Sequence, residues 1–173
     1  VNGTIVLNGT TAALTTGAQA STDDSVVTGL VTNTDGIITA AAVDFQGGVS
    51  NADVMDVTGD SSGTLITNTG SGVLTIETGA TLTADVTQNS GSAMVNIDGT
   101  LGAGASVLTV TDGTAALNGE VDGTIVLNGA AAALTTGAQA GGDDAVVTGL
   151  VTNTDGTITA VAVDFQGGVS NAD

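Results

Sequence analysis

The chain of 173 residues contains 18 Asp and Glu residues and no Lys, Arg or His, which gives a formal net charge of −18. Ion pairs between its side chains are therefore impossible, and nucleic acids and anionic membranes are excluded as partners because both are bound through basic side chains. The absence of Cys excludes disulfides and thiolate metal sites. No apolar run reaches the roughly 18 residues of a membrane span, so membrane insertion is not expected.

The composition predicts an ordered all-β fold with a narrow core. Hydrophobic residues make up 41% of the chain, Pro is absent, and 27 Gly residues separate runs rich in Val, Ile, Leu and Thr. Two Phe are the only aromatic residues, so small aliphatic side chains must fill the interior. Small aliphatic side chains can fill a core that is only two side chains wide.

Short strands are expected at intervals of roughly 8–10 residues along the chain, because apolar and polar residues alternate within short runs. Clear examples are Leu74–Glu77 and Leu82–Val86, and no apolar stripe of helical period is present. The runs, most of which open with Gly, are GTIVLNG (3–9), GTLITNTG (63–70), GVLTIETG (72–79), GATLTADV (79–86) and GTAALNGE (113–120).

The chain is internally repetitive. Residues 1–53 return as residues 121–173, with identical residues at 45 of the 53 positions. We therefore expect residues 1–120 to be one complete tandem repeat and residues 121–173 to begin the next, within one continuous fold that lacks a true domain boundary. We therefore expect this chain to be part of a longer array of tandem repeats.

A shorter motif within the repeat predicts the coils of a parallel β-solenoid. Val31-Thr32-Asn33 resembles Val49-Ser50-Asn51, and similar triplets begin at later apolar residues. The leading residues are Val31, Val49, Ile66, Val86, Leu108, Leu127 and Val151. Their successive position numbers differ by 18, 17, 20, 22, 19 and 24. The repeat is therefore expected to contain six coils, each of about 20 residues, a usual length for a solenoid unit. A division into five coils with a looped insert near Val43–Val54 is the alternative.

Stacked coils would place an amide side chain above the amide of the coil before. An amide both donates and accepts, so amides at the strand spacing of about 4.8 Å can form a continuous hydrogen-bonded ladder. The candidates are Asn33, Asn51, Asn68 and Gln88, with Asn153 restarting the series. The alternative interpretation is that Asn merely marks turns.

Two segments resemble the passenger domains of bacterial filamentous haemagglutinins and autotransporters. GLVTNTDGTITA (149–160) is similar to their L-x-N-x-G-T-I-x-A turns, and SGVLTIETGATLTADV (71–86) is similar to their Gly-Thr-Leu-Thr strands. The resemblance implies a right-handed parallel β-helix that is secreted to the bacterial cell surface. There it would serve as an adhesin stalk or a matrix fibre.

Catalysis is not expected, because without His, Cys, Lys, Arg or Tyr only carboxylates could act as acids or bases. Asn33-Thr34-Asp35 and Asp23-Asp24 resemble two motifs of polygalacturonase-like hydrolases. Their order is reversed here, and the Gly-His-Gly and Arg-containing motifs are missing. The sequence therefore predicts turn-forming aspartates beside a stacked Asn, and no enzyme.

Oxygen-rich loops make calcium the one candidate ligand among metals and cofactors. The densest cluster comprises Asn51, Asp53, Asp56 and Asp60, and Asp23 with Asp24 is a second candidate. Neither cluster matches an EF-hand loop or a calcium-binding nonapeptide repeat. The alternative is a diffuse cation atmosphere around an acidic surface.

Two further residue types have competing interpretations. Phe45, repeated as Phe165, is either a core plug or an exposed contact between fibres. Thr triplets of the T-x-T type occur at 32/34, 67/69, 81/83 and 152/154, and such ladders on some solenoids bind ice. The incomplete recurrence of these triplets favours ordinary solvated strands.

These patterns predict a mechanical function. The expected role is a structural repeat of an extracellular bacterial filament or adhesin stalk with an acidic surface. Its partners would be copies of itself, along or between filaments, and a host or neighbouring-cell surface. The alternatives are a ligand-binding adhesin, a calcium-stabilised biofilm matrix protein, a functional amyloid and an ice-binding solenoid.

Overall fold

Runs of alternating apolar and polar residues form strands throughout the computed structural model, which describes residues 1–18 and 24–172. These residues contain no helix, and their 17 strands form one continuous sheet in which neighbouring strands are parallel. The strands are β1 (Ile5–Thr15), β2 (Ser25–Val27), β3 (Val31–Ala40), β4 (Val43–Phe45), β5 (Val49–Asn51), β6 (Val54–Val57), β7 (Ser61–Asn68), β8 (Val73–Ile76), β9 (Thr81–Ile97), β10 (Thr100–Leu117), β11 (Glu120–Leu127), β12 (Ala132–Thr136), β13 (Ala145–Val147), β14 (Val151–Asn153), β15 (Thr157–Thr159), β16 (Val163–Phe165) and β17 (Val169–Asn171).

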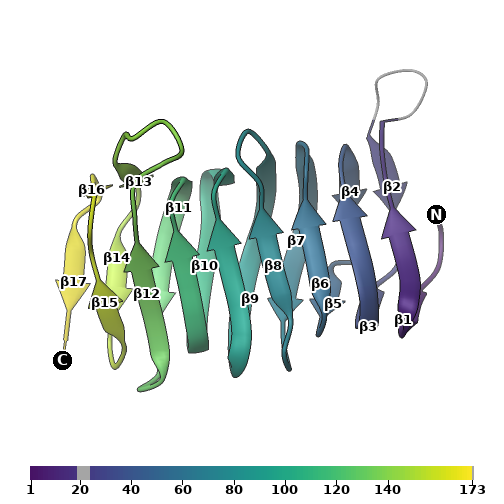
Figure 1. Cartoon of the computed structure of the whole chain (residues 1–173), viewed down its shortest axis with the longest axis horizontal. Coiled ribbons are helices and arrows are strands. Elements are labelled where there is room, and N and C mark those ends of the chain that lie inside the picture. Colours follow the sequence, from purple (N-terminus) through teal and green to yellow (C-terminus); the bar gives the residue numbers. More distant parts are fainter. Residues whose placement is uncertain (19–23, 173) are drawn as a thin grey trace.

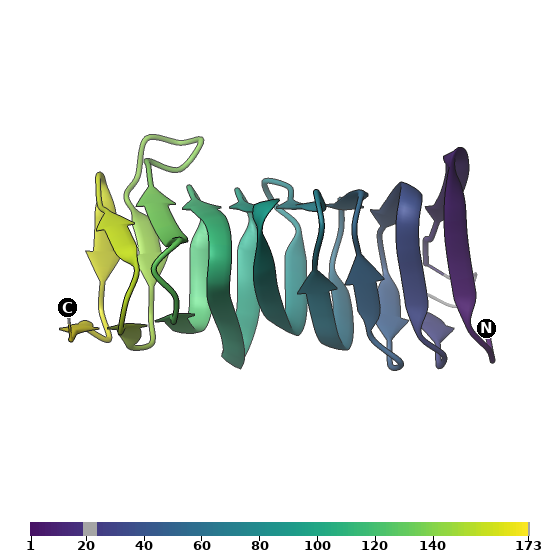
Figure 2. The ribbon, with the colours of Figure 1, turned by 90° about the horizontal axis from the view of Figure 1, so that it is seen from below.

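The sheet is wound into a right-handed parallel β-solenoid, as predicted. In Figure 1 the nearer strands run upward and the more distant ones downward, while the chain advances from the N-terminus on the right to the left. Seen from below in Figure 2, the coils again follow one another along the long axis, with the two termini at opposite ends.

Each complete coil contributes strand segments to three faces. The first face contains β2, β4, the starts of β7, β9, β10 and β11, then β13 and β16. The second contains the starts of β1 and β3, β5, the end of β7, the middles of β9 and β10, the end of β11, β14 and β17. The third contains the ends of β1 and β3, β6, β8, the ends of β9 and β10, β12 and β15.

The register of the second face confirms six coils per repeat and corrects one predicted position. The paired residues, in coil order, are Ile5, Val31, Val49, Ile66, Val86, Leu108, Ile125, Val151 and Val169. Leu127 was therefore the wrong leading residue, because Ile125 occupies that column and the coil that begins there is correspondingly longer. The five-coil alternative is also wrong, since β4, β5 and β6 lie in register where it placed a loop.

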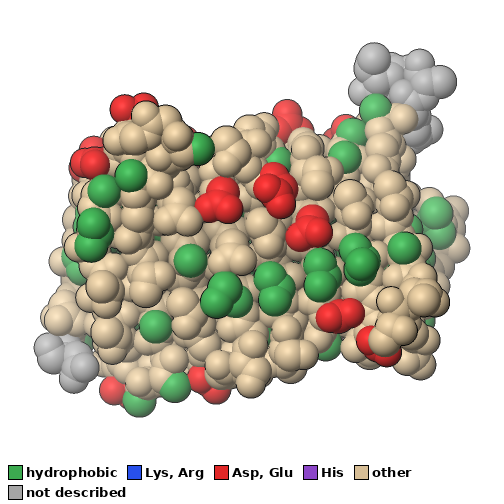
Figure 3. Space-filling view, viewed as in Figure 1, with side chains coloured by type: hydrophobic (Ala, Val, Ile, Leu, Met, Phe, Trp, Pro, Cys, Tyr) green, Lys and Arg blue, Asp and Glu red, His purple; other side chains and the backbone are tan. Residues whose placement is uncertain are grey.

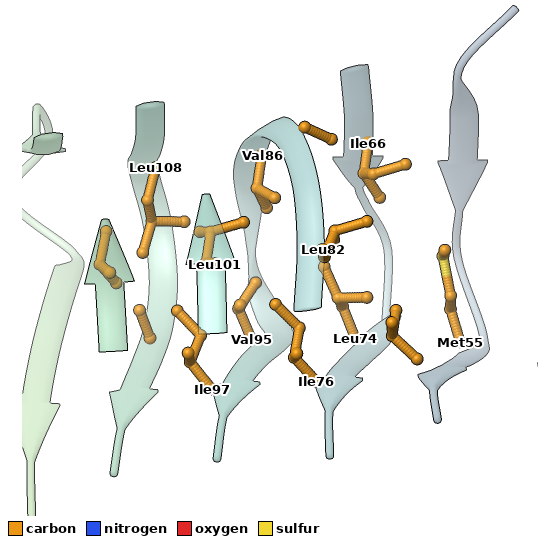
Figure 4. Packing of buried hydrophobic residues seen from close by; sticks show 14 of the residues in the cluster. Met55, Ile66, Leu74, Ile76, Leu82, Val86, Val95, Ile97, Leu101 and Leu108 are labelled. Atoms are coloured by element: carbon orange, nitrogen blue, oxygen red, sulfur yellow. The ribbon is translucent and has the colours of Figure 1, made fainter. Parts of the chain in front are cut away.

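The core is a set of aliphatic columns parallel to the axis. On the third face Met55 lies beside Leu74 and Leu74 beside Val95, and each of these side chains is fully buried. Figure 4 shows these side chains pointing into the interior, with residues of neighbouring coils side by side. Because each coil covers the apolar surface of the next, small residues suffice to exclude water from this narrow interior.

Close backbone contact at the corner between the first and second faces requires Gly. A Cβ atom on Gly29 would lie 2.2 Å from the carbonyl oxygen of Gly3, and one on Gly47 would lie 2.3 Å from the carbonyl carbon of Gly29. The corner between the third and first faces is different, since Ala42 and its repeat Ala162 adopt a left-handed conformation with φ of 49°. Both copies of the repeat therefore contain the same strained Ala.

The fold passes from one repeat to the next without interruption. Strand β11 spans the junction at residues 120 and 121, and the pairing of Val31 with Val49 recurs as that of Val151 with Val169. The two copies differ at the corner between the second and third faces, where β1 and β3 are continuous. The counterparts of β1, namely β11 and β12, and those of β3, namely β14 and β15, are separate strands. A repeat of 120 residues thus returns the chain to the same phase of the coil.

Candidate functional site: the amide ladder and the outer faces

Four amide side chains form a continuous hydrogen-bonded row inside the solenoid, on the second face. Nδ2 of Asn33 donates to Oδ1 of Asn51 at 2.8 Å, and Nδ2 of Asn51 donates to Oδ1 of Asn68 at 2.9 Å. Nδ2 of Asn68 then donates to Oε1 of Gln88 at 2.8 Å. All four residues are fully buried. We call this row, Asn33 to Gln88, the amide ladder.

The ladder also fixes the corner that follows it. Nδ2 of Asn68 donates to the carbonyl oxygens of Gly72, at 2.8 Å, and of Met94 in the next coil, at 2.9 Å. Asn33 and Asn51 make equivalent bonds to carbonyl oxygens of their own coil and the following one. Each Asn amide therefore adds side-chain hydrogen bonds at this corner, where the carbonyl oxygens of Asp53 and Gly72 also accept a backbone N–H from the next coil.

The ladder has two distinct ends because its neighbours in the same column are aliphatic. Leu7 precedes Asn33 and Val110 follows Gln88. Oδ1 of Asn33 consequently faces a coil with no amide, and it has no hydrogen-bond partner. After Leu127 the column resumes, and Nδ2 of Asn153 donates to Oδ1 of Asn171 at 2.9 Å.

A second set of hydrogen bonds, which the sequence analysis did not anticipate, links coils at the outside of the same corner. Thr34, Thr69, Thr111 and Thr154 donate through Oγ1 to the carbonyl oxygens of Leu7, Asn51, Gln88 and Leu127 respectively. Each acceptor belongs to the residue that occupies the ladder column in the preceding coil. In the sequence, a Thr directly after the residue that occupies the ladder column could have predicted these hydrogen bonds.

The T-x-T triplets do not form one continuous surface. Thr81 and Thr83 lie on the first face, whereas the other three triplets begin on the second. Within those three, the second Thr bonds to the backbone as described above. The outward row of the second face does present hydroxyls on successive coils, namely Thr32, Ser50, Thr67, Thr87 and Thr109, before Val126 interrupts it.

The candidate calcium residues are not assembled into one site. Asn51 is buried in the amide ladder, Asp53 and Asp60 lie between strands, and Asp56 lies on β6. Over residues 1–18 and 24–172, no three carboxylates are grouped so that they could share a metal ion. Asp24 is exposed, as are its repeat Asp144 and the neighbouring Asp143, and Asp23 lies outside the described residues.

Asp56 is electrostatically distinct. Its side chain lies in the outward row of the third face, where β6 pairs with β3 and β8, and it is only partly exposed. Burial raises the pKa of this carboxyl above its ordinary value of 3.8, because the ionised form loses hydration. Ionisation of Asp56 therefore opposes folding, because no basic side chain of the chain can compensate its lost hydration.

The residues that resemble a hydrolase motif have structural roles here. Asn33 is buried in the ladder, and Thr34 bonds to the backbone of the preceding coil. Asp35 is only partly exposed, and a carboxylate at Asp23 falls outside the described part of the chain. Within these motifs, the described Asn33 and Thr34 are therefore held in hydrogen bonds between coils.

The two Phe residues occupy equivalent places with different burial. Phe45 is fully buried between Val27 of the preceding coil and Gly63 of the following one, and a Cβ atom on Gly63 would lie 3.3 Å from that of Phe45. Gly63 thus leaves room for the backbone and Cβ atom of Phe45. Phe165 is partly buried and packs against the core in the last described coil.

A hollow of about 520 Å³ lies at the first coil and is lined by residues that include Ile5, Leu14 and Val27. In the second copy the equivalent Ile125, Leu134 and Val147 are fully buried. The hollow is therefore the uncovered end of the core rather than a shaped binding site.

Comparison with protein-family models, with curated proteins and with solved structures finds no match to this chain. None of the described segments forms an apolar helix of membrane-spanning length.

Proposed function

We propose that the chain is a structural segment of an extracellular bacterial filament or adhesin stalk, in which it sets length and stiffness. The observation that carries the proposal is the unbroken junction between repeats. Strand β11 crosses it, and the same register recurs after 120 residues. Further copies could extend the sheet without a joint, so the length of the rod would follow from the number of repeats.

Stiffness along the axis follows from how the coils are connected. Successive coils are joined by backbone hydrogen bonds on three faces, by the amide ladder inside and by Thr hydroxyls at a corner. A bending force must distort many of these bonds at once. Only the two ends of such a rod expose unpaired strand edges.

The acidic surface and the resemblance to filamentous-haemagglutinin passengers support an extracellular, cell-surface location. Eighteen carboxylates without a basic side chain keep the rod solvated and separate from similar rods. The absence of Lys and Arg also removes the cleavage sites of trypsin-like proteases. Partners on this proposal are further copies of the repeat and a surface that a terminal domain contacts.

Arrays of two, four and six 120-residue units test the proposal. At about 4.8 Å per coil, six coils should add roughly 29 Å for each repeat, which electron microscopy of the arrays can measure. On cells that display the arrays, the reach of a terminal epitope should increase in proportion. A contour length that does not grow with repeat number, or a reach independent of it, would contradict a role in spacing.

A further inference from the structure

The outward side of the third face carries a continuous apolar row. Ile37, Val54, Val73 and Met94 are paired in register on β3, β6, β8 and β9, so they follow one another along the axis. Ile37 and Met94 are 45% and 40% exposed, and the two Val side chains are partly exposed. Figure 3 shows hydrophobic side chains gathered in such a row along the molecule. We call these four residues the apolar ridge.

Carboxylates border the ridge on both sides. Asp35 and Asp53 lie toward the beginning of these strands, while Asp56, Glu77 and Asp98 lie at or beyond their ends. Figure 3 shows acidic side chains above and below the hydrophobic row. Asp56 is two residues beyond Val54, and Glu77 is four residues beyond Val73, which places the carboxylates about 7–13 Å along the strands.

The apolar ridge and the carboxylates that border it together determine what kind of partner could bind there. An apolar strip bordered on both sides by negative charge matches an apolar strip bordered by positive charge. A second copy of this chain lacks that complement, because it contains no Lys, Arg or His and would bring carboxylates against carboxylates. The occupant must therefore come from another molecule that carries basic side chains.

We propose that the apolar ridge is a docking surface for a cationic amphipathic helix of a partner protein. The ridge covers four coils, or about 14 Å at the strand spacing, which a helix of about ten residues matches at 1.5 Å per residue. A helix is about 10–12 Å wide with its side chains, so Lys or Arg on its two flanks would reach the bordering carboxylates. Apolar contact would anchor the helix, and the charges would give specificity and accelerate association.

A labelled 14-residue Leu/Lys peptide with a single apolar helical stripe is a suitable probe, and fluorescence anisotropy measures its binding. The ridge variant combines Ile37→Thr with Val73→Thr, and Thr157 already stands at the position equivalent to Ile37. The control variant combines Val6→Thr with Val126→Thr, which changes two outward residues of the second face. A peptide of the same composition in scrambled order controls for charge.

We expect the amphipathic peptide to bind the wild type and the control variant equally. It should bind the ridge variant at least tenfold more weakly, at an unchanged melting temperature. Combining Glu77→Gln with Asp98→Asn should weaken binding and reduce its salt dependence. Equal binding of the scrambled peptide, or equal affinity for the ridge variant, would show that charge alone is responsible and overturn the proposal. Sedimentation that reveals a dimer dispersed by the ridge variant would identify a second copy as the occupant instead.

Discussion

The side-chain amide of Asn68 donates to that of Gln88 at 2.8 Å, although Gln is longer than Asn by one methylene. The longer side chain fits because Gly113 follows in the next coil, where a Cβ atom would lie 2.6 Å from Nε2 of Gln88. Beyond Gln88 the column continues with Val110, and Nε2 turns to the carbonyl oxygen of Ser90 at 3.4 Å. The amide ladder thus ends at Gln88, whose side chain donates to a backbone carbonyl of its own coil.

Removing one amide from the middle of the ladder should be costly. Asn51→Ala deletes the acceptor of Asn33 and the donor to Asn68. It also removes the side-chain hydrogen bonds to the carbonyl oxygens of Asp53 and Val73. We expect a loss of about 2–4 kcal/mol in the free energy of unfolding, measured by denaturant titration. Asn96→Ala, on the outward side of β9, is the control and should change it by less than about 0.5 kcal/mol. Equal effects of the two changes would argue against a stabilising ladder.

Phe45 and Phe165 allow a comparison within one chain. Phe45→Ala should cost about 3–5 kcal/mol of unfolding free energy, because the ring is fully buried. Phe165→Ala should cost clearly less, because Phe165 is only partly buried. Light scattering of the two variants tests the alternative of a contact between fibres. Loss of bundling with unchanged stability in Phe45→Ala would support that alternative.

Ala42 offers a stabilising substitution. Its left-handed φ of 49° costs an L-residue roughly 1–2 kcal/mol, whereas Gly adopts it freely but loses about 0.5–1 kcal/mol of chain entropy on folding. Ala42→Gly should therefore raise the unfolding free energy by up to about 1.5 kcal/mol. The adjacent Ala41→Gly introduces the same entropy cost without relieving a positive φ. If both changes destabilise the protein to the same extent, the backbone at Ala42 is not strained.

Asp56 predicts a specific dependence of stability on pH. Since burial raises the pKa of Asp56 in the folded state, the folded protein holds this proton more tightly than the unfolded chain does. Ionised Asp56 therefore destabilises the fold at neutral pH, and this penalty disappears as the pH falls through the folded pKa toward 3.8. Asp56→Asn should be more stable than the wild type at pH 7 and equally stable in acid.

Unfolding of both proteins across the acidic range measures that effect, with the exposed Glu77→Gln as the control for losing one charge. A stability difference that persists unchanged into acid would mean that Asn stabilises the position for another reason.

Salt should stabilise the whole molecule. Eighteen carboxylates repel one another, and screening over a Debye length of about 10 Å at 0.1 M salt weakens this repulsion. We expect the melting temperature in calorimetry to rise with sodium chloride. Calcium at equal ionic strength should add little, because the described carboxylates form no shared metal site. A large additional rise in millimolar calcium, reversed by a chelator, would instead indicate specific binding.

The sequence contained enough information to place most coils. Val31, Val49, Ile66, Val86 and Leu108 were identified because each begins a triplet whose third residue points inward. Leu127 is the wrong leading residue, and it resembles one because Asn128 follows it as an Asn follows the apolar residue in the motif. In the structure Ile125 takes that column and Leu127 itself occupies the amide position. The short sequence motif alone does not reveal whether an Asn side chain points into the solenoid or out of it.

The outer surface was harder to anticipate than the core. Ile37, Val54, Val73 and Met94 are unevenly spaced along the chain and share no local motif, so only the register of the third face brings them together. The unpartnered Oδ1 of Asn33 also depends on register, because it results from the Leu7 of another coil. Properties that depend on pairing between coils require the three-dimensional structure.

The return of the register after 120 residues has a genetic consequence. Recombination between near-identical copies in a gene removes or adds whole units, and each unit here ends at the same phase of the coil at which it began. Such events would shorten or lengthen the protein while every interior contact is regenerated at the new junction. The length of the protein could thus change by whole repeats while the register of the coils is preserved.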